Sequence, residues 1–235
     1  MQTIRDRDER KFQEFCRLGK ILKMPTLEAF LEIMVVMPDG KVVHHHKQRS
    51  RSWVRNVYNK LFSELGAVNF TGAYGAGGLA AKDTGGTVKS VSCPFGFYYG
   101  VSMLTAGEGY IGPVASNISG IVVGSGVNAE SFEDYALQTI IANGTGAGQL
   151  SYVLGEPYAV SYDAPTKVMT AIHARYFNNN SAGVVSVNEV ALYSKENTGS
   201  VWYGCNSRDK LGATVTIPAS GQLKVTYTVQ LTYPA

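Results

Sequence analysis

The chain has 235 residues, of which 45% are hydrophobic and 17% charged, and its formal net charge is +3. This composition excludes an intrinsically disordered chain, and the length suits one large domain with at most a small appendage. The charge is unevenly distributed, because residues 1–65 hold 13 basic and 8 acidic residues and the remainder is net negative. The asymmetry indicates two regions with different surroundings.

Residues 3–24 carry an approximate helical stripe of apolar residues, with acidic residues early and lysines late. This pattern predicts a helix that ends at Pro25. The first residues lack the apolar stretch of a signal peptide, and no apolar run in the chain approaches the roughly 18 residues of a membrane span. We therefore expect a soluble chain made in the cytosol, with a helix that lies on its own body or on a neighbouring subunit.

Two strands are predicted next, at residues 27–37 and 41–47, joined by the turn residues Pro38-Asp39-Gly40. Residues 50–65 predict a second helix with a serine as its cap. The histidines at 44–46 stand in the second strand, so His44 and His46 share one face and His45 takes the other. Two imidazoles are too few for a metal site, so we expect no metal ion and no cofactor.

The same segment is strongly basic, because residues 41–60 contain six lysines and arginines and no acidic residue. Such a patch attracts phosphate, but Trp53, Tyr58 and Phe62 have the spacing of a helix core and not of a platform on which bases stack. The alternatives are a solvated face, a subunit interface with acidic neighbours, and contact with nucleic acid. The residues that we select as the anchoring surface are Arg49, Arg51, Trp53 and Arg55.

The glycine-rich stretch from 66 to 126 includes GAYGAGG, which resembles a phosphate-binding loop only superficially because no GK[ST] follows. Short strands at 86–92 and 95–104, joined by long ordered loops, are expected instead. Aromatic residues in or near loops are the feature that a ligand-binding surface would use. The candidates for ligand-facing aromatics are Tyr74, Tyr98, Tyr99, Tyr110 and Trp202.

From Gly120 onward the pattern is one of short strands separated by turns, with a helical turn expected at 128–137, capped by Asn128 or Ser131. The last strand alternates apolar and polar residues, which favours an antiparallel sandwich or jelly roll. Arg208-Asp209-Lys210 falls between two predicted strands, where an ion pair within the chain is the default. The strands predicted after Gly120 are 149–154, 159–163, 167–178, 184–194, 200–206, 213–217 and 222–233.

The predicted fold class is therefore mainly β, with an antiparallel β-sandwich or jelly-roll-like module at 119–235. An N-terminal helix and a hairpin–helix anchoring region occupy 1–66, and a glycine-rich loop and strand region occupies 67–118. No GxSxG elbow or local Cys–His pair is present, and Cys16, Cys93 and Cys205 are too widely spaced for a zinc knuckle or a disulfide framework. The chain is predicted to have no catalytic residues and not to be an enzyme.

Motifs of the C-terminal half resemble a β-rich module in structural proteins of tailed bacteriophages: GIVVGSG, DYAL, ARYFNNN, VNEVALY, RDKL and QLKVTYT. The segment KVVHHHKQRSRSWVRN is similar to one that joins a hairpin to a helix before such modules. The similar parts cover roughly residues 27–65 and 119–233. The matching positions are Gly124, Gly126, Asp134, Leu137, Arg175, Phe177, Asn179, Asn188, Glu189, Leu192, Tyr193, Arg208, Leu223, Val225, Tyr227 and Thr228.

The resemblance implies a virion part that is present in many copies, on the capsid surface, the tail or its fibres. Its partners would be other virion proteins and copies of itself in a homo-oligomer, with no membrane, and it would reach the virion after synthesis in the host cytoplasm. One alternative is a receptor- or glycan-binding fibre module. Another, not favoured, is a nucleic-acid-contacting protein at the genome side of the shell.

Overall fold

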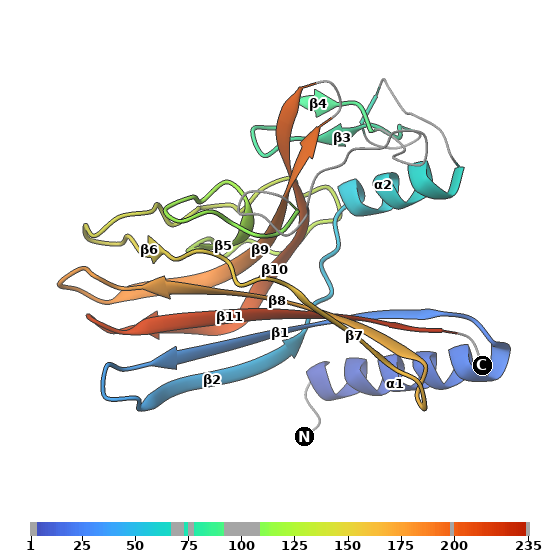
Figure 1. The fold of residues 1–235 in the computed structure, drawn as a ribbon, viewed down its shortest axis with the longest axis horizontal. Coiled ribbons are helices and arrows are strands. Elements are labelled where there is room, and N and C mark those ends of the chain that lie inside the picture. The colour runs from blue at the N-terminus through green and yellow to red at the C-terminus, as the bar shows by residue number, and fades with distance from the viewer. Residues whose placement is uncertain (1–3, 67–72, 75–77, 92–108, 198–199, 234–235) are drawn as a thin grey trace.

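The structure is a computed structural model that describes all residues except 1–3, 67–72, 75–77, 92–108, 198–199 and 234–235. The described part is mainly β, and its two larger antiparallel sheets pack face to face like a β-sandwich (Figure 1). The predicted fold class is thereby confirmed. Neither helix in this part of the chain has the length and apolar character needed to cross a bilayer.

The larger sheet has six strands in the order β2–β1–β11–β8–β6, with β7 also paired to β8, and the smaller sheet has the order β10–β9–β5. The larger sheet consists of β1 (Thr26–Val36), β2 (Val42–Arg49), β6 (Ser151–Tyr152), β7 (Ala159–Asp163), β8 (Val168–Asn178) and β11 (Gln222–Thr232). The smaller sheet consists of β5 (Gly120–Gly124), β9 (Val185–Asn197) and β10 (Val201–Ile217). A separate pair is formed by β3 (Ala81–Lys82) and β4 (Val88–Lys89).

The N-terminal hairpin is an integral part of the larger sheet, because all 11 residues of β1 pair with β11. Its turn has the predicted chemistry: the N–H of Gly40 donates to the carbonyl of Met37 at 2.9 Å, and Oδ1 of Asp39 accepts from the N–H of Lys41 at 2.9 Å. Gly40 has a φ of 83°, which glycine adopts without steric cost. The division of the chain into regions at 1–66, 67–118 and 119–235 stays a prediction.

The core lies between the two sheets and follows from strand alternation. Every second residue of β1 and β11 points inward, where burial of apolar surface stabilises the fold. The fully buried residues on these two strands are Leu31, Ile33, Val35, Leu223, Val225 and Tyr227. They pack against apolar residues of the smaller sheet that include Ile121, Leu192 and Ile217. Cys205 is a buried free thiol and Cys16 a half-buried one, and Cys93 lies outside the described residues.

Both predicted helices are present, α1 (Ile4–Leu22) and α2 (Arg55–Gly66). α1 lies beside the start of β1, where a Cβ on the buried Gly19 would stand 2.5 Å from Cγ2 of Thr26. α1 ends as predicted before Pro25: the N–H of Met24 donates to the carbonyl of Gly19 at 2.9 Å, and Lys23 takes a φ of 55°. The buried residues of α2 are polar, Asn56, Asn59 and Ser63, and the helix packs against β10 and β3. The spacing of a helix core predicted for Tyr58 and Phe62 is not used in this way, because these side chains are about half exposed.

The turn predicted within residues 128–137 is present as a single hydrogen-bonded turn, in which Oγ of the predicted cap Ser131 accepts from the N–H of Glu133 at 3.2 Å. One prediction of secondary structure is wrong. The strands predicted at 200–206 and 213–217 are one strand, β10, whose register shifts between Cys205 and Ser207 and again between Lys210 and Val215. These irregularities let the strand continue through Arg208-Asp209-Lys210, which were expected between strands. The strand predicted at 95–104 lies outside the described residues.

Candidate functional site

The basic segment of β2 pairs with acidic residues of the same chain. Arg49 donates from Nη2 to Oε1 of Glu9 in α1 at 2.7 Å, and from Nη1 to Oε1 of Glu28 in β1 at 2.5 Å. The Arg49 side chain is only 7% exposed, and its guanidinium lies 4.5 Å from the ring centroid of Phe12 and 4.8 Å from that of Phe30. This one residue therefore joins α1 to the sheet through both ion pairs and stacking.

Arg51 adds to the same contact, because its Nη1 donates to Oδ2 of Asp8 at 2.9 Å and its guanidinium lies 5.6 Å from the centroid of Phe12. The Arg49 guanidinium holds the pKa of the Glu9 carboxyl below its usual value of 4.5. We call this set the α1 latch. It consists of Asp8, Glu9, Phe12, Arg49 and Arg51.

The other two candidates for the anchoring surface also have contacts within the chain. Arg55 binds both carboxylate oxygens of Glu133, with Nε to Oε2 at 2.8 Å, and lowers the pKa of that carboxyl. Trp53 is half-buried, and its backbone forms an isolated antiparallel bridge with Ser207. The acidic neighbours expected for the basic segment are thus intramolecular, and its contact with other subunits stays a prediction.

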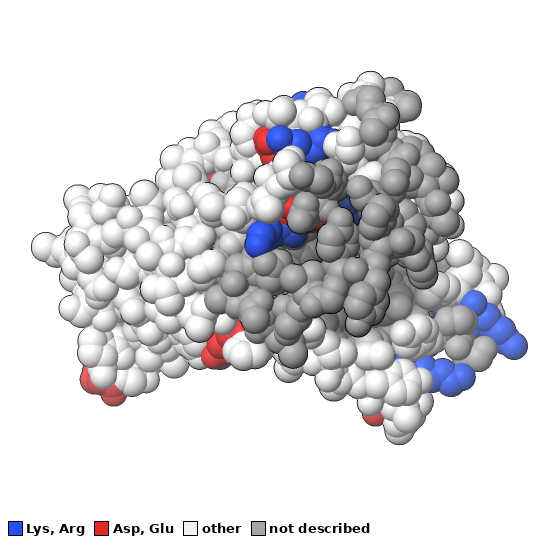
Figure 2. Space-filling view, turned by 45° about the horizontal axis from the view of Figure 1, so that its top comes forward, with Lys and Arg blue, Asp and Glu red and all other residues white. Residues whose placement is uncertain are grey.

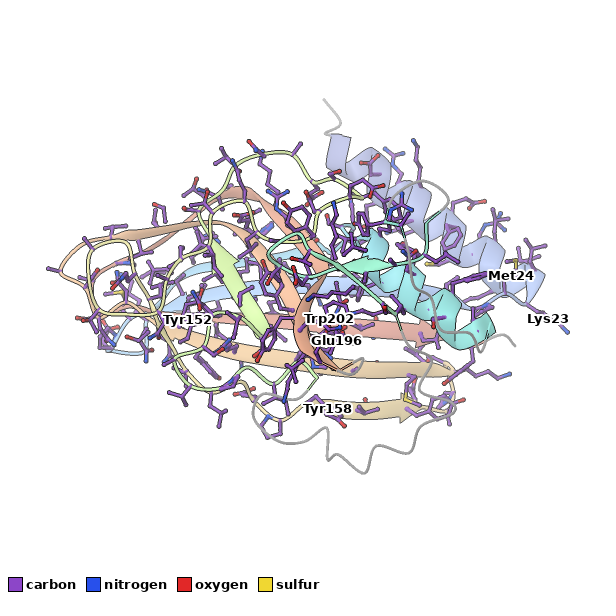
Figure 3. The ribbon with its side chains drawn as sticks, turned by 90° about the horizontal axis from the view of Figure 1, so that it is seen from above. Lys23, Met24, Tyr152, Tyr158, Glu196 and Trp202 are labelled. Carbon is purple, nitrogen blue, oxygen red and sulfur yellow. The ribbon has the colours of Figure 1, made fainter. Side chains whose placement is uncertain are left out.

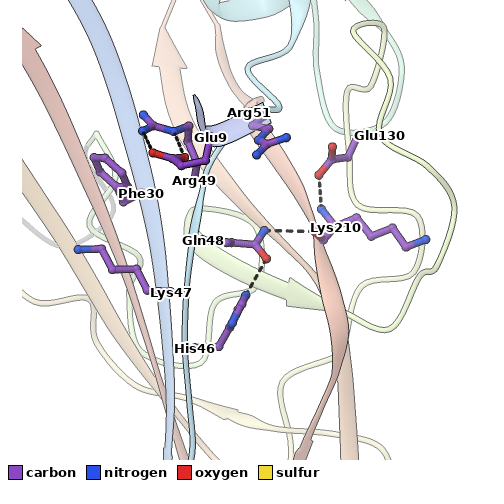
Figure 4. Close-up of a pocket in the computed structure, with 9 residues that line it drawn as sticks. All are labelled: Glu9, Phe30, His46, Lys47, Gln48, Arg49, Arg51, Glu130 and Lys210. Carbon is purple, nitrogen blue, oxygen red and sulfur yellow. Dashed lines mark hydrogen bonds and ion pairs between the residues drawn. The ribbon is translucent and has the colours of Figure 1, made fainter. Parts of the chain in front are cut away.

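A groove of about 540 Å³ follows the edge of β2 between α1 and β10 (Figure 4). Both faces of β2 line it, with Lys47 and Arg49 from one face and His46 and Gln48 from the other. Nε2 of Gln48 donates to the carbonyl oxygen of Lys210 at 3.2 Å, which spans the groove from one sheet to the other (Figure 4). The remaining lining residues are Glu9, Phe30, Arg51 and Glu130.

The groove carries more positive than negative charge, with four basic side chains against two carboxylates. Glu9 is already bound by Arg49, and Oε1 of Glu130 accepts from the N–H of Lys210 at 2.7 Å. Both Lys47 and Lys210 are exposed, and within the described residues neither forms an ion pair with a carboxylate. The groove can therefore attract acidic groups.

The histidines alternate as predicted, because His46 pairs with the buried Ile33 and His44 with the buried Val35. His45, on the other face, contacts Oε1 of Glu32 at 2.7 Å through Nε2. In the described part of the chain, no group of three or more His, Cys, Asp or Glu residues is placed to hold a metal ion. Burial lowers the pKa of His44.

Trp202 is not a ligand-facing aromatic. It lies in β10 with 4% of its surface exposed and packs with Ala81 and Val91 in a small apolar cluster. It was expected near a loop, but the pairing of β10 with β9 carries it into the fold, opposite Glu196 (Figure 3). The sequence pattern gave no sign of this burial, because the residues that cover Trp202 are far away along the chain.

The other described aromatic candidates are also used within the fold. The Tyr110 hydroxyl accepts from Nδ2 of Asn206 at 2.9 Å, and its ring meets that of His173 edge-on at 5.1 Å. Tyr74 is half-buried, and its ring centroid lies 4.5 Å from the ammonium of Lys82. The remaining two candidates, Tyr98 and Tyr99, lie outside the described residues.

Three of the motif residues form a largely buried charged network. The ion pair within the chain that was predicted for the Arg208 segment is confirmed, but the sequence did not identify its partners, Glu189 and Asp134. Glu189 is completely buried, and its carboxylate accepts from Nε of Arg208 at 2.8 Å and from the N–H of Thr139 at 2.8 Å. Arg208 also donates to Oδ2 of Asp134 at 2.8 Å. Because Glu189 accepts a third bond from the N–H of Gly126 at 3.0 Å, this network holds the loop after β5 on the smaller sheet.

Other motif residues likewise hold turns and loops against the strands. A Cβ on Gly126 would stand 2.4 Å from Oε1 of Glu189, so only glycine fits there. Arg175 is buried and has no carboxylate partner among the described residues; it donates to five backbone carbonyls, and desolvation lowers its pKa to about 10. Nδ2 of Asn179 donates to the carbonyls of Gly183 and Ile217, each at 2.8 Å, which ties two turns together. These motif residues therefore hold turns and loops in place.

α1 presents an apolar stripe to solvent, beside the face that packs on the sheet. Positions 15, 18 and 22 follow helical spacing, and Ile21 and Met24 extend the surface toward the end of the helix. The stripe consists of Phe15, Leu18, Ile21, Leu22 and Met24, which are 41–63% exposed. Basic side chains gather at the end of the molecule toward which α1 runs (Figure 2), where Lys20 and Lys23 are exposed. Met24 lies at this projecting tip (Figure 3).

Comparison of the chain with protein-family models, with curated proteins and with solved structures finds no match.

Proposed function

We propose that this protein is a non-enzymatic structural subunit of a tailed-phage virion, of the capsid-decoration or tail and fibre accessory type. It acts through contact surfaces with neighbouring subunits, including copies of itself. The phage assignment comes from the resemblance of the strand and turn motifs. The contact role rests on the surface of the molecule.

The single observation that carries the contact role is the apolar stripe of α1. Exposure of large apolar side chains to water is unfavourable in free energy. A contiguous exposed patch of such side chains therefore marks an interaction site. The helix that bears them is held on its own sheet by the α1 latch, so the stripe is presented on a fixed support. A neighbouring subunit that covers the stripe would bury this apolar area.

The charged clusters support the same proposal. Glu189, Arg208 and Asp134 bind one another and the backbone, and Arg175 donates its hydrogen bonds to backbone carbonyls. Each of these groups is used to hold loops on strands, which is the role of a structural network. Arg49, Arg51 and Arg55 are paired with carboxylates of the chain, so no specific observation favours the nucleic-acid alternative. The burial of Trp202 removes one of the aromatics on which the glycan-binding alternative depends.

The test is cryo-electron microscopy and quantitative mass spectrometry of purified particles of the phage that encodes the chain. We expect the chain in many copies per particle, with the apolar stripe of α1 covered by a neighbouring subunit. Absence of the chain from the purified particle would contradict the proposal. Turnover of a substrate by the isolated chain would contradict its non-enzymatic part.

A further inference from the structure

β2 is the edge strand of the larger sheet, and in Figure 1 it forms the lower border of that sheet. It pairs with β1 on one side, and no strand in the described part of the chain pairs with its other side. An edge strand presents unpaired backbone N–H and C=O groups, which are a template for a further strand.

The register shows which backbone groups of β2 face outward. The N–H of Ser50 donates to the carbonyl of Ala29 at 2.8 Å, so this opposed pair is hydrogen-bonded. In an antiparallel ladder, hydrogen-bonded and non-hydrogen-bonded pairs alternate along the strands. The pairs Arg49–Phe30, Lys47–Glu32 and His45–Met34 are therefore non-hydrogen-bonded, and the N–H and C=O groups of residues 45, 47 and 49 point away from β1. These groups repeat at every second residue, which is the spacing that an extended peptide matches.

The groove described above lies along this edge. Side chains from both faces of β2 line the same cavity of about 540 Å³. Lys47 and Arg49 come from one face, and His46 and Gln48 from the other. A cavity lined from both faces follows the strand edge itself. It therefore offers room for a chain segment at the position where backbone groups are free.

The charge of the groove selects the partner. Lys47 and Lys210 border it, and among the described residues neither ammonium forms an ion pair with a carboxylate; Lys41 adds charge at the other end of the strand. A second copy of β2 would bring the same basic side chains opposite these, and like charges across a strand pair are destabilising. An acidic segment would instead place negative side chains opposite these lysines, and opposite charges across a strand pair are stabilising.

We propose that the edge of β2 binds an extended acidic segment of a different protein chain, which adds as a further strand to the larger sheet. Backbone hydrogen bonds to residues 45, 47 and 49 hold the segment, and its acidic side chains meet Lys47 and Lys210. This mode of recognition takes its affinity from the main chain and its specificity from alternate side chains. The inference deepens the proposed structural role and rests on it for the identity of the partner as a neighbouring virion protein.

The experiment uses the full chain and fluorescein-labelled peptides of alternating glutamate and valine, with fluorescence anisotropy as the readout. A peptide of alternating lysine and valine is the charge control. We expect saturable binding of the acidic peptide, with at least about tenfold weaker binding of the basic one. Duplex DNA serves as a competitor. The inference is overturned if the acidic peptide does not bind. It is also overturned if duplex DNA binds the wild-type chain more tightly than the acidic peptide binds it.

Two further peptides separate backbone pairing from simple charge attraction. In one the amide nitrogens of the glutamates are methylated, and in the other those of the valines. A strand that pairs along one edge turns only every second N–H toward its neighbour. We therefore expect one methylated peptide to lose about tenfold or more in affinity while the other keeps it. Equal affinity of the two would overturn the inference.

A matched pair of variants tests the protein side. Lys47→Pro removes the outward N–H, whereas Lys47→Ala removes the same charge and keeps the N–H. We expect Lys47→Pro to bind the acidic peptide about tenfold or more weakly than Lys47→Ala, and equal affinities would count against the inference. Circular dichroism checks that both variants fold, and if Lys47→Pro does not, the methylated peptides on the wild type decide.

The particle itself distinguishes this inference from the proposed function. If the chain is present in the virion but the β2 edge is unpaired, the structural role stands and the added strand is excluded. If peptides bind as expected but the chain is absent from the virion, the binding surface stands and the virion role fails.

Discussion

Arg208 and Glu189 lie side by side in the interior of the smaller sheet and carry opposite charges. A buried ion pair contributes little relative to an apolar pair, but removal of one partner leaves a buried charge without compensation. We expect Arg208→Met to lower the free energy of unfolding by about 3 kcal/mol, because Glu189 and Asp134 both lose it as a donor. Urea denaturation followed by circular dichroism measures this change.

The matched control is Arg17→Met, which breaks the exposed pair between Arg17 and Glu14 on α1. This control removes the same side chain at the surface, where solvent screens the charges. Its denaturation midpoint should stay close to that of the wild type. A similar midpoint for both variants would show that the buried network contributes nothing specific.

His173 gives the protein a pH-dependent stability. Burial against Tyr110 and Tyr158 lowers its pKa below the usual 6.5, because the charged imidazolium is poorly solvated there. The unfolded chain then binds the proton more readily than the folded one, so stability is complete above pH 6.5 and falls as the pH drops through that value. His44, whose pKa is also lowered, contributes with the same sign.

We expect the free energy of unfolding to decrease between pH 7.5 and pH 5, and to decrease less in His173→Phe. Tyr162→Phe, at an exposed position of β7, is the control and should keep the wild-type slope, because it removes no imidazole. The measurement is urea denaturation at a series of pH values in that interval. An unchanged slope in His173→Phe would rule out the buried imidazole as its source.

At the scale of the element, α1 depends on the α1 latch for its position. Glu9→Gln removes the charged partner of Arg49 and keeps the size of the side chain. We expect trypsin to cleave within α1 about fivefold faster in this variant, because a weaker charge-assisted pair lets the helix leave the sheet more often. The measurement is mass spectrometry of the early cleavage products at neutral pH.

Glu14→Gln is the matched control for that experiment. Glu14 lies on the same helix, and its partner among the described residues is Arg17 of that helix, so its loss leaves the contact with the sheet intact. Cleavage of α1 should remain close to the wild-type rate. Equal acceleration by both substitutions would attribute the effect to helix propensity and not to the α1 latch.

At the scale of the whole molecule, the exposed apolar stripe predicts self-association. We expect the purified chain to form oligomers as its concentration rises, because contact between copies removes the stripe from water. The double variant Leu18→Glu and Leu22→Glu should shift the molecule to monomers and raise the apparent dissociation constant at least tenfold. Size-exclusion chromatography with light scattering measures both.

The control for this prediction is Leu154→Glu, which places the same charge at another exposed leucine, outside α1. This variant should associate as the wild type does. A wild-type chain that stays monomeric at high concentration would remove the support for contact between copies. In that case, contact of the stripe with other virion proteins would be tested in the purified particle.

The sequence by itself determined most of the described strands, the turn at Pro38-Asp39-Gly40 and both helices, because alternation, turn residues and helical spacing are local properties. It also identified the basic segment and the motif positions, but it assigned them no neighbours. Strand alternation predicts that Arg49 lies on one face of a strand. Only the tertiary structure brings the carboxylates of Glu9 and Glu28 to its guanidinium.

Only the tertiary structure decided which polar residues are interior and which surfaces stay open. In the sequence, Glu189 and Arg208 have no feature that distinguishes them from exposed strand residues. In the structure, the pairing of β9 with β10 and the loop after β5 bury both side chains. The place of β2 at the edge of its sheet depends on β1 pairing with β11, near the other end of the chain. Burial and free strand edges arise from contacts between distant segments, and no local pattern specifies them.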